Sequence, residues 1–332
     1  MAMRLMALVF AFLLGAVPCR AEIDTVRIPL GAGGFGFLPL YVMQARGLIE
    51  KHAHDAGLEL KADWIKVGGP TAMNDALLSG SADFIAAGPP GFLTLWSRTT
   101  TSMKIKGVAA MTAMPTYLTT RQARLQTLED FREGDKIAVT APRVSIVAIC
   151  MQMYARQKYG AAETYRFEPF LLPMSHADAT IAMLSGSTAI TADWSSPPFY
   201  EREMKNLAIH TITDTDKLLG GPVTFTMLST TSKFRAENPK AYAAVLAALK
   251  DAVALIRSDK VAAAKIFLEK EPGGFSEEEI VSVLNEPQTQ FGTAPQGVMR
   301  YANFMFEAGL MKVRPTSWKD VFFPEIHDLE GN

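Results

Sequence analysis

The chain has 332 residues, at least twice the usual domain size of about 100–150 residues, so two domains or two lobes of one fold are expected. Hydrophobic residues make up 48% and charged residues 20%, which supplies a sizeable core and excludes global disorder. The 33 basic and 34 acidic residues give a net charge of −1, so the chain lacks the excess positive charge that binds nucleic acids, and we expect no nucleic-acid partner.

The first 21 residues have the pattern of a secretory signal peptide. An apolar run over residues 5–16 follows one early basic residue, and Cys19 and Ala21 stand at the −3 and −1 positions of a cleavage site. About 12 apolar residues are fewer than the roughly 20 that a membrane span needs. We therefore expect an exported, soluble protein that begins at Glu22. A lipoprotein would instead be acylated at Cys19, although the residues before it form a poor approach to such a cysteine.

Short strands and helices alternate in the next part of the chain. A β-branched run over residues 25–30 predicts a first strand, and Pro39 with apolar residues at helical spacing predicts a helix. Strands separated by helices imply parallel sheets with helices on both faces. The further expected elements are a strand at 58–67, a helix at 71–78, a strand at 83–87, a helix at 92–97, and the same alternation from 136 to 210.

Two segments resemble each other at an offset of 106 residues. Residues 76–83 (ALLSGSAD) and 182–189 (AMLSGSTA) both have the pattern of a helix that ends at Ser-Gly before a strand. Each strand then leads into a loop with two prolines, at 88–90 and 195–198. The repeat predicts two lobes of like topology. Ligands of open α/β sheets bind beyond the carboxyl ends of the strands, so both loops are expected at one cleft.

Helices are expected to dominate the last third of the chain. A strand is predicted at 224–230, and Asn238 with Pro239 begins a helix that carries one apolar stripe. Ser276 followed by three glutamates is a capping box at the start of another helix. We find no chemical motif in these helices and no symmetric apolar seam, and we expect a monomer.

Catalytic and metal-binding motifs are absent from the sequence, and neither an enzyme nor a cofactor is expected. Residues 31–36 fit the G-x-G-x-x-G pattern of dinucleotide sites, but the second strand ends in residues 68–70 (GGP) and lacks the acidic residue that holds a ribose. The glycines are better explained by a loop that approaches a ligand or the other lobe. His52 and His54 are two residues apart on a helix and therefore point to different faces rather than sharing a metal, and Cys150 is expected in the core.

Four stretches carry a family resemblance through their order and spacing. They are PLYVMQARGLIEKH at 39–52, ALLSGSADF at 76–84, LEDFREGDKIAV at 128–139 and DWSSP at 193–197. Together they resemble the periplasmic substrate-binding proteins of the nitrate/sulfonate/taurine class of ABC transporters, and the similarity runs from about Val26 to about Leu268.

The resemblance implies a type II periplasmic-binding-protein fold: two α/β lobes, each a mixed, mostly parallel sheet flanked by helices, with the ligand cleft between them. Lobe one would comprise residues 22–113 and 221–332, and lobe two residues 114–220. The implied function is the solute-binding component of an ABC importer, which closes on a small organic solute and delivers it to a permease in the inner membrane. The alternatives are a secreted or periplasmic enzyme on the same fold and a sensory binding protein for a membrane receptor.

The strand ends supply the candidate ligand-binding residues. Thr140, Arg143 and Ser145 lie between a strand and a helix start, where free N–H groups favour an anion and Arg143 would add a bidentate donor. Asp193 and Trp194 end the matching strand of lobe two and offer a carboxylate and a ring. This set suits a small organic acid or sulfonate with an apolar or amino-bearing body. The remaining candidates are Phe35 and Phe37 on the first loop, Gly88 and Pro89 after the third strand, and Thr224 and Phe225 near the second crossing.

Overall fold

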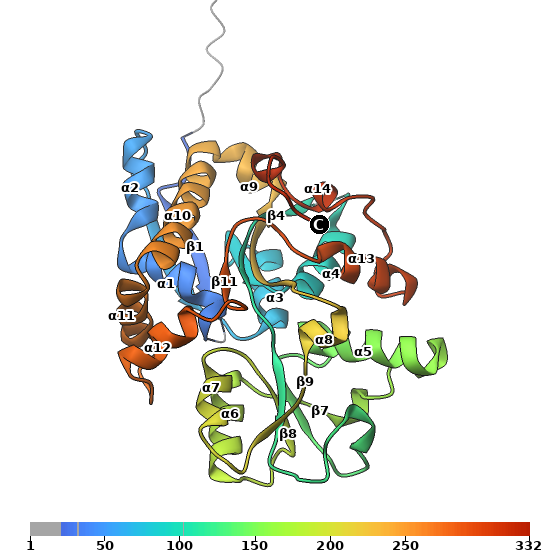
Figure 1. The fold of residues 1–332 in the computed structure, drawn as a ribbon. Helices are drawn as coiled ribbons and strands as arrows, with labels where there is room; N and C mark the ends of the chain where they lie inside the picture. The colour runs from blue at the N-terminus through green and yellow to red at the C-terminus, as the bar shows by residue number, and fades with distance from the viewer. Residues whose placement is uncertain (1–20, 32, 102) are drawn as a thin grey trace, which may run out of the picture.

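Three β-sheets organise residues 21–31, 33–101 and 103–332, the part of the chain that the computed structural model describes. A two-stranded and a four-stranded sheet form lobe one, and a five-stranded sheet forms lobe two. In Figure 1 the green and yellow segments of lobe two lie below the blue, orange and red segments of lobe one. The predicted signal peptide, including Cys19, lies outside the described residues apart from Ala21.

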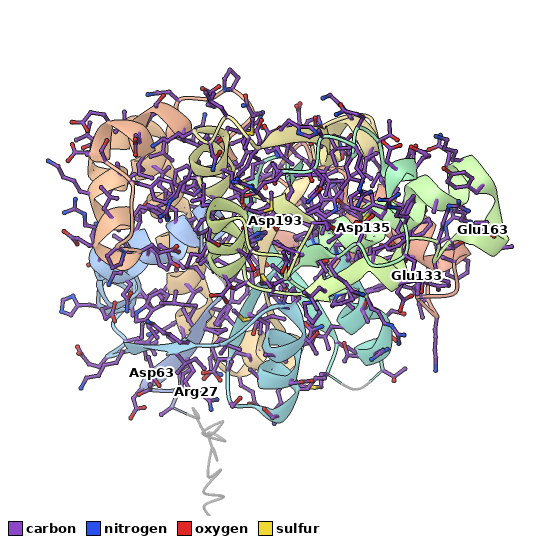
Figure 2. All side chains as sticks on the ribbon, turned by 90° about the horizontal axis from the view of Figure 1, so that it is seen from below. Arg27, Asp63, Glu133, Asp135, Glu163 and Asp193 are labelled. Carbon is purple, nitrogen blue, oxygen red and sulfur yellow. The ribbon has the colours of Figure 1, made fainter. Side chains whose placement is uncertain are left out.

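The sheets of lobe one combine strands from both ends of the chain. In the two-stranded sheet, β1 (Thr25–Leu30) pairs in parallel with β2 (Lys61–Lys66), and Arg27 lies opposite Asp63. Figure 2 shows these two side chains close together at the edge of the molecule. The four-stranded sheet has the order β11-β4-β10-β3, with all its pairs antiparallel. Its strands are β3 (Phe84–Ala87), β4 (Ile105–Ala113), β10 (Thr224–Thr231) and β11 (Gln290–Phe291).

Lobe two has one mixed sheet of order β7-β6-β8-β5-β9. Strand β6 pairs in parallel with β7 and β8, whereas β5 is antiparallel to β8 and β9. The strands are β5 (Tyr117–Thr120), β6 (Ile137–Val139), β7 (Leu171–Pro173), β8 (Ala192–Ser195) and β9 (His210–Asp214).

The observed fold is the predicted α/β fold of two lobes, with one correction to the strand directions. The five-stranded sheet is mixed and the four-stranded sheet is antiparallel, so the sheets are not mostly parallel. The reason lies in the two crossings between the lobes. Strand β5 enters lobe two directly from lobe one, and β10 enters lobe one directly from lobe two, so each lies antiparallel to the strands it joins.

The internal repeat is confirmed by two matching helices. Helix α3 (Pro70–Ser79) and helix α6 (His176–Ser185) have ten residues each. They end at Gly80 and Gly186, whose φ angles of 72° and 71° are in the left-handed region that favours glycine. Strands β3 and β8 follow, and each leads into a further helix.

The remaining helices cover the sheets and fill the last third of the chain, and the predicted capping box of Ser276 and Glu279 is present. They are α1 (Leu38–Ala45), α2 (Leu48–Asp55), α4 (Pro89–Thr99), α5 (Ile146–Tyr159), α7 (Phe199–Met204), α8 (Thr215–Leu219), α9 (Ser232–Glu237), α10 (Pro239–Ser258), α11 (Lys260–Lys270), α12 (Glu277–Leu284), α13 (Val298–Glu307) and α14 (Trp318–Val321). No helix in the described part of the chain is both long enough and apolar enough to span a bilayer.

Helix α5 connects the hydrophobic cores of the two lobes. Ile149 and Cys150 belong to the large core of lobe one, whereas Val147 and Met151 belong to the core of lobe two. Cys150 is fully buried as a free thiol, and burial raises its pKa to about 12, so it is a core residue as predicted. The start of α5 is therefore held rigidly where the lobes meet.

Candidate functional site

A cavity of about 70 Å³ lies between the lobes at the carboxyl ends of strands from both. Its volume is about half of the roughly 150 Å³ that accommodates a benzene ring in a protein interior. The lobes must therefore move apart before a larger solute enters. The lining residues from lobe one are Gly33, Phe37, Gly68, Gly69, Pro70, Met73, Ala86, Ala87, Gly88, Phe225 and Thr226; those from lobe two are Thr140, Val144, Ser145, Ile146, Val147 and His176; and Thr116 lies on the first crossing.

Helix starts from both lobes surround this cavity. Gly69 and Gly88 are the N-caps of α3 and α4, and neither helix start receives a hydrogen bond from a capping side chain. Ser145 caps α5, where its Oγ accepts a hydrogen bond of 3.4 Å from the Ala148 N–H. These starts present the positive ends of the helix dipoles to the cavity. Pro70 in α3 and Pro89 with Pro90 in α4 carry no N–H, so these two helix starts offer fewer free donors than α5.

The side chains that line the cavity are uncharged. None of the described lining residues is Asp, Glu, Lys or Arg. Burial lowers the pKa of His176 to about 4, and a hydrogen bond with the backbone of Trp194 opposes this only in part. His176 is therefore neutral at pH 7, and Phe37, Met73 and Phe225 make much of the surface apolar.

A partly buried glutamate, Glu271, holds the glycine-rich loop at one wall of the cavity. Oε1 of Glu271 accepts hydrogen bonds from the Gly34 N–H at 2.7 Å and from the Tyr41 hydroxyl at 2.6 Å. Gly33 has φ 91°, and a Cβ there would come within 2.9 Å of Oε2 of Glu271. Glycine is therefore required by both the backbone angle and the close approach. Glu271 belongs to the same lobe as this loop, so its contact is not the predicted approach to a ligand or the other lobe; Gly34 makes that approach, since a Cβ there would lie 3.1 Å from the Phe199 ring of lobe two.

Contacts outside the cavity also join the lobes. The Phe35 N–H donates to the Pro197 carbonyl at 3.3 Å. We call a second group the clasp: Arg202 and Lys205, on and beside α7, with Gly273, Phe275 and Glu279. Arg202 Nη1 donates to the Gly273 carbonyl at 3.0 Å, and its guanidinium lies over the Phe275 ring at 5.7 Å. Lys205 forms an ion pair with Glu279. Contacts between the lobes therefore lie just before α7, within it and just after it.

Five of the residues predicted from the sequence line this cavity. Phe37, Gly88, Thr140 and Ser145 lie in the segments that follow β1, β3 and β6, and Phe225 lies in β10.

Arg143 lies away from the cavity, on the surface. Its side chain is 82% exposed, and Nε donates to Oε1 of Glu168 at 2.9 Å. The neighbouring residues Val144 and Ser145 line the cavity instead. The predicted strand-to-helix loop therefore reaches the cavity, but the position of this guanidinium gives no support to an anion-binding role.

The other predicted residues outside the lining are structural in their contacts. Trp194 is fully buried in the core of lobe two, where Nε1 contacts Met151 Sδ at 3.4 Å. Phe35 packs edge-on against Phe267 at 5.1 Å. Thr224 Oγ1 accepts from the Gln296 N–H at 2.8 Å, and Pro89 is buried at the first position of α4.

Asp193 belongs to a buried carboxyl pair. It is 1% exposed and Glu203 is 0% exposed, and Figure 2 shows Asp193 well inside the outline of the molecule. Glu203 accepts hydrogen bonds from Thr119 at 2.6 Å and from Ser195 at 3.0 Å. Burial raises the pKa of both carboxyls, and the nearby charge of Glu203 raises that of Asp193 further. Two negative charges are therefore disfavoured at this buried pair, and the hydrogen bonds of Glu203 within lobe two make a structural role the simpler explanation.

Several lining residues were not predicted from the sequence. The clearest are Pro70 and His176, each the first residue of its helix, at the same offset of 106 residues as the repeat. The sequence could have predicted this pair, because the repeat relates the two positions and ligands bind beyond the carboxyl ends of the strands. Thr116 lies on the short crossing between β4 and β5, and no local sequence pattern marks it as a lining residue.

The fold is shared with solved periplasmic binding proteins. No protein-family model matches the sequence, and no curated protein sequence matches it. Among solved structures, the alkanesulfonate-binding protein SsuA from Xanthomonas axonopodis pv. citri bound to MOPS is similar, with a TM-score of 0.68 and 17% identity over 89% of this chain and 96% of that chain.

Two further solved structures show the same likeness. The periplasmic aliphatic sulphonate binding protein SsuA from Escherichia coli has a TM-score of 0.61 and 17% identity, over 91% of this chain and 92% of that one. The periplasmic nitrate-binding protein NrtA from Synechocystis PCC 6803 has a TM-score of 0.64 and 14% identity, over 88% and 83%. These neighbours confirm the predicted fold class and agree with the resemblance found in the sequence.

Proposed function

We propose that this chain is the periplasmic solute-binding component of an ABC importer, which captures a small organic solute by closing its two lobes. The observation that supports this most strongly is the cavity at which strand ends and helix starts of both lobes meet. A solute there contacts both lobes only when they are closed. Its binding energy therefore favours the closed state by the contacts that are made only in that state.

The proposal includes the parts of the chain and its partners. Lobe one would comprise residues 22–113 and 221–332, lobe two residues 114–220, and residues 1–21 would be a cleaved signal peptide. The mature protein would be a monomer that presents its closed form to a permease of the inner membrane. The similarity to sulfonate- and nitrate-binding proteins supports a transport role over an enzyme or a sensory protein.

A ligand screen tests this function. The purified mature chain is screened by thermal shift against sulfonates, carboxylates, amino acids, neutral heterocycles and nitrate, and each compound that raises Tm is recovered and analysed after incubation. We expect at least one compound to raise Tm with Kd near the micromolar range, about −8 kcal/mol, and to be recovered unchanged. Turnover of that compound, or the absence of any stabilising compound, would refute the proposal.

A further inference from the structure

Thr116 has a hydroxyl group without a hydrogen-bond partner in the described part of the chain. The residue is 1% exposed and lines the cavity between the lobes, and Oγ1 forms no hydrogen bond with any described residue. Buried hydroxyl groups are nearly always paired, and leaving one unpaired costs about 1–3 kcal/mol. An unpaired hydroxyl at a cavity wall is a place where a ligand group can complete the hydrogen bonding.

Neighbouring threonines follow the ordinary rule. Thr112 and Thr226 share a hydrogen bond of 2.7 Å between their hydroxyls, and Thr226 also lies 2.7 Å from the Gly36 carbonyl. The Thr120 hydroxyl donates to the Thr191 carbonyl at 2.7 Å. Thr116 thus differs from these threonines because its buried hydroxyl has no hydrogen-bond partner among the described residues.

The backbone of Thr116 holds this hydroxyl in a fixed place. Its N–H donates to Oγ1 of Thr215 at 3.0 Å, and its carbonyl accepts from the Thr215 N–H at 2.9 Å. Thr215 begins α8 on the other crossing between the lobes. The two crossings therefore brace Thr116 where both lobes meet, and the group is preorganised for a solute between them.

The rest of the cavity limits the chemistry of that solute. The dipoles of α3 and α4, whose starts line the cavity, favour acceptor oxygens and disfavour cations there, although their first residues, Pro70, Pro89 and Pro90, have no N–H to donate. None of the described lining residues carries a charge that could pair with an ammonium group. Phe37 and Phe225 favour an apolar body.

We propose that Thr116 is a ligand-binding residue whose hydroxyl donates a hydrogen bond to an acceptor oxygen of a compact, largely apolar solute that has no cationic group. This inference rests on the proposed solute-binding function. The acceptor oxygen can belong to an anion or to a neutral amide, and the choice of probes separates these two sources.

The test uses two matched sets of probes: benzoate, benzamide and benzylamine, and propionate, propionamide and propylamine. Thermal shift and calorimetry are applied to the native chain and to three variants. Thr116→Val removes the hydroxyl and keeps the shape, and Thr116→Ser keeps the hydroxyl. Thr289→Val is the matched control, since Thr289 is 7% exposed with an unpartnered Oγ1 and does not line the cavity.

We expect an oxygen-bearing probe to raise Tm and the amine of the same set to leave it unchanged. Thr116→Val should raise Kd for that probe about threefold or more for an amide, and about tenfold or more for a carboxylate. Thr116→Ser and Thr289→Val should stay within about twofold of the native chain. Without ligand, Thr116→Val should be no less stable than the native chain, because it removes an unpaired hydroxyl.

Three results would overturn the inference: native affinity in Thr116→Val, a larger shift with an amine than with its oxygen-bearing partners, or no shift with any oxygen-bearing probe. If the wider screen still finds a ligand that is recovered unchanged, the binding function stands and only the role of Thr116 or the solute class fails. If no compound of either panel binds, the binding function fails as well.

Discussion

The free energy of unfolding should decrease as the pH rises, because the buried carboxyl of Glu201 then loses its proton. Glu201 lies on α7, and Oε2 is buried without a hydrogen-bond partner among the described residues. Burial is the main cause that raises its pKa from 4.5 to about 7, and the charges of Glu286 and Glu203 raise it further. Glu286 follows α12 in lobe one, so the repulsion acts between the lobes.

The size and sign of the effect follow from proton linkage. Between pH 4.5 and about 7 the unfolded chain has released this proton while the folded chain retains it. Unfolding becomes easier as the pH rises through this window. A difference of about 2.5 pKa units corresponds to roughly 3 kcal/mol, fully present as stability below pH 4.5 and lost above pH 7.

The variant Glu201→Gln removes this titration and keeps the shape of the side chain. Urea denaturation at pH 4.5 and pH 8 gives the free energy of unfolding of the variant and of the native chain. We expect the variant to gain roughly 3 kcal/mol relative to the native chain between these two pH values. The buried pair of Asp193 and Glu203 remains in both proteins, so most of its own pH dependence cancels in the comparison.

The exposed Glu330→Gln substitution is the matched control, and its difference from the native chain should be the same at both pH values. If the difference for Glu201→Gln also stays constant to within about 0.5 kcal/mol, the reasoning from burial is refuted.

Three further predictions concern the N-terminus, the clasp and Trp194, a candidate site residue that does not line the cavity. Glu22 accepts hydrogen bonds from the N–H groups of Lys240 at 3.0 Å and Ala241 at 2.9 Å at the start of α10, so Glu22→Ala should lower the free energy of unfolding by about 1 kcal/mol; unchanged stability in urea would contradict this. Lys205→Glu should weaken solute binding about two- to fivefold by calorimetry, and adding Glu279→Lys should restore it, because the ion pair joins the lobes. Arg166→Glu breaks an ion pair with Glu163 inside lobe two and is the control; equal effects of the two substitutions would show that the clasp does not act in closure. Trp194→Phe should lower stability by about 1–3 kcal/mol and leave Kd unchanged, whereas a large loss of affinity at native stability would return Trp194 to the site.

Much of the fold could be predicted from local patterns. The strand at 25–30 was predicted at its observed bounds, and α3 differs from its prediction by one residue at each end. Turn and cap residues explain this success, because Gly80, Gly186 and Ser276 act through their own backbone or a near neighbour. The strand directions were less accessible, since they depend on how the chain crosses between the lobes.

The candidate site was predictable at the level of loops and less so at the level of side chains. Ser145 and Gly88 line the cavity because a strand-to-helix junction fixes them there. Arg143, in the same loop as Ser145, pairs with Glu168, which lies 25 residues further along the chain. Asp193 and Trp194 lie in the body of β8, and tertiary packing rather than local sequence decides what they contact.

The structure of the complex with the compound that raises Tm most is the most direct test of the solute-binding function. We predict electron density for that compound in the cavity between the lobes, against Phe37 and Phe225, with atoms of both lobes in contact with it. Density for the compound only on the outer surface of one lobe, for example beside Tyr242 and Lys250 of α10, would contradict the account.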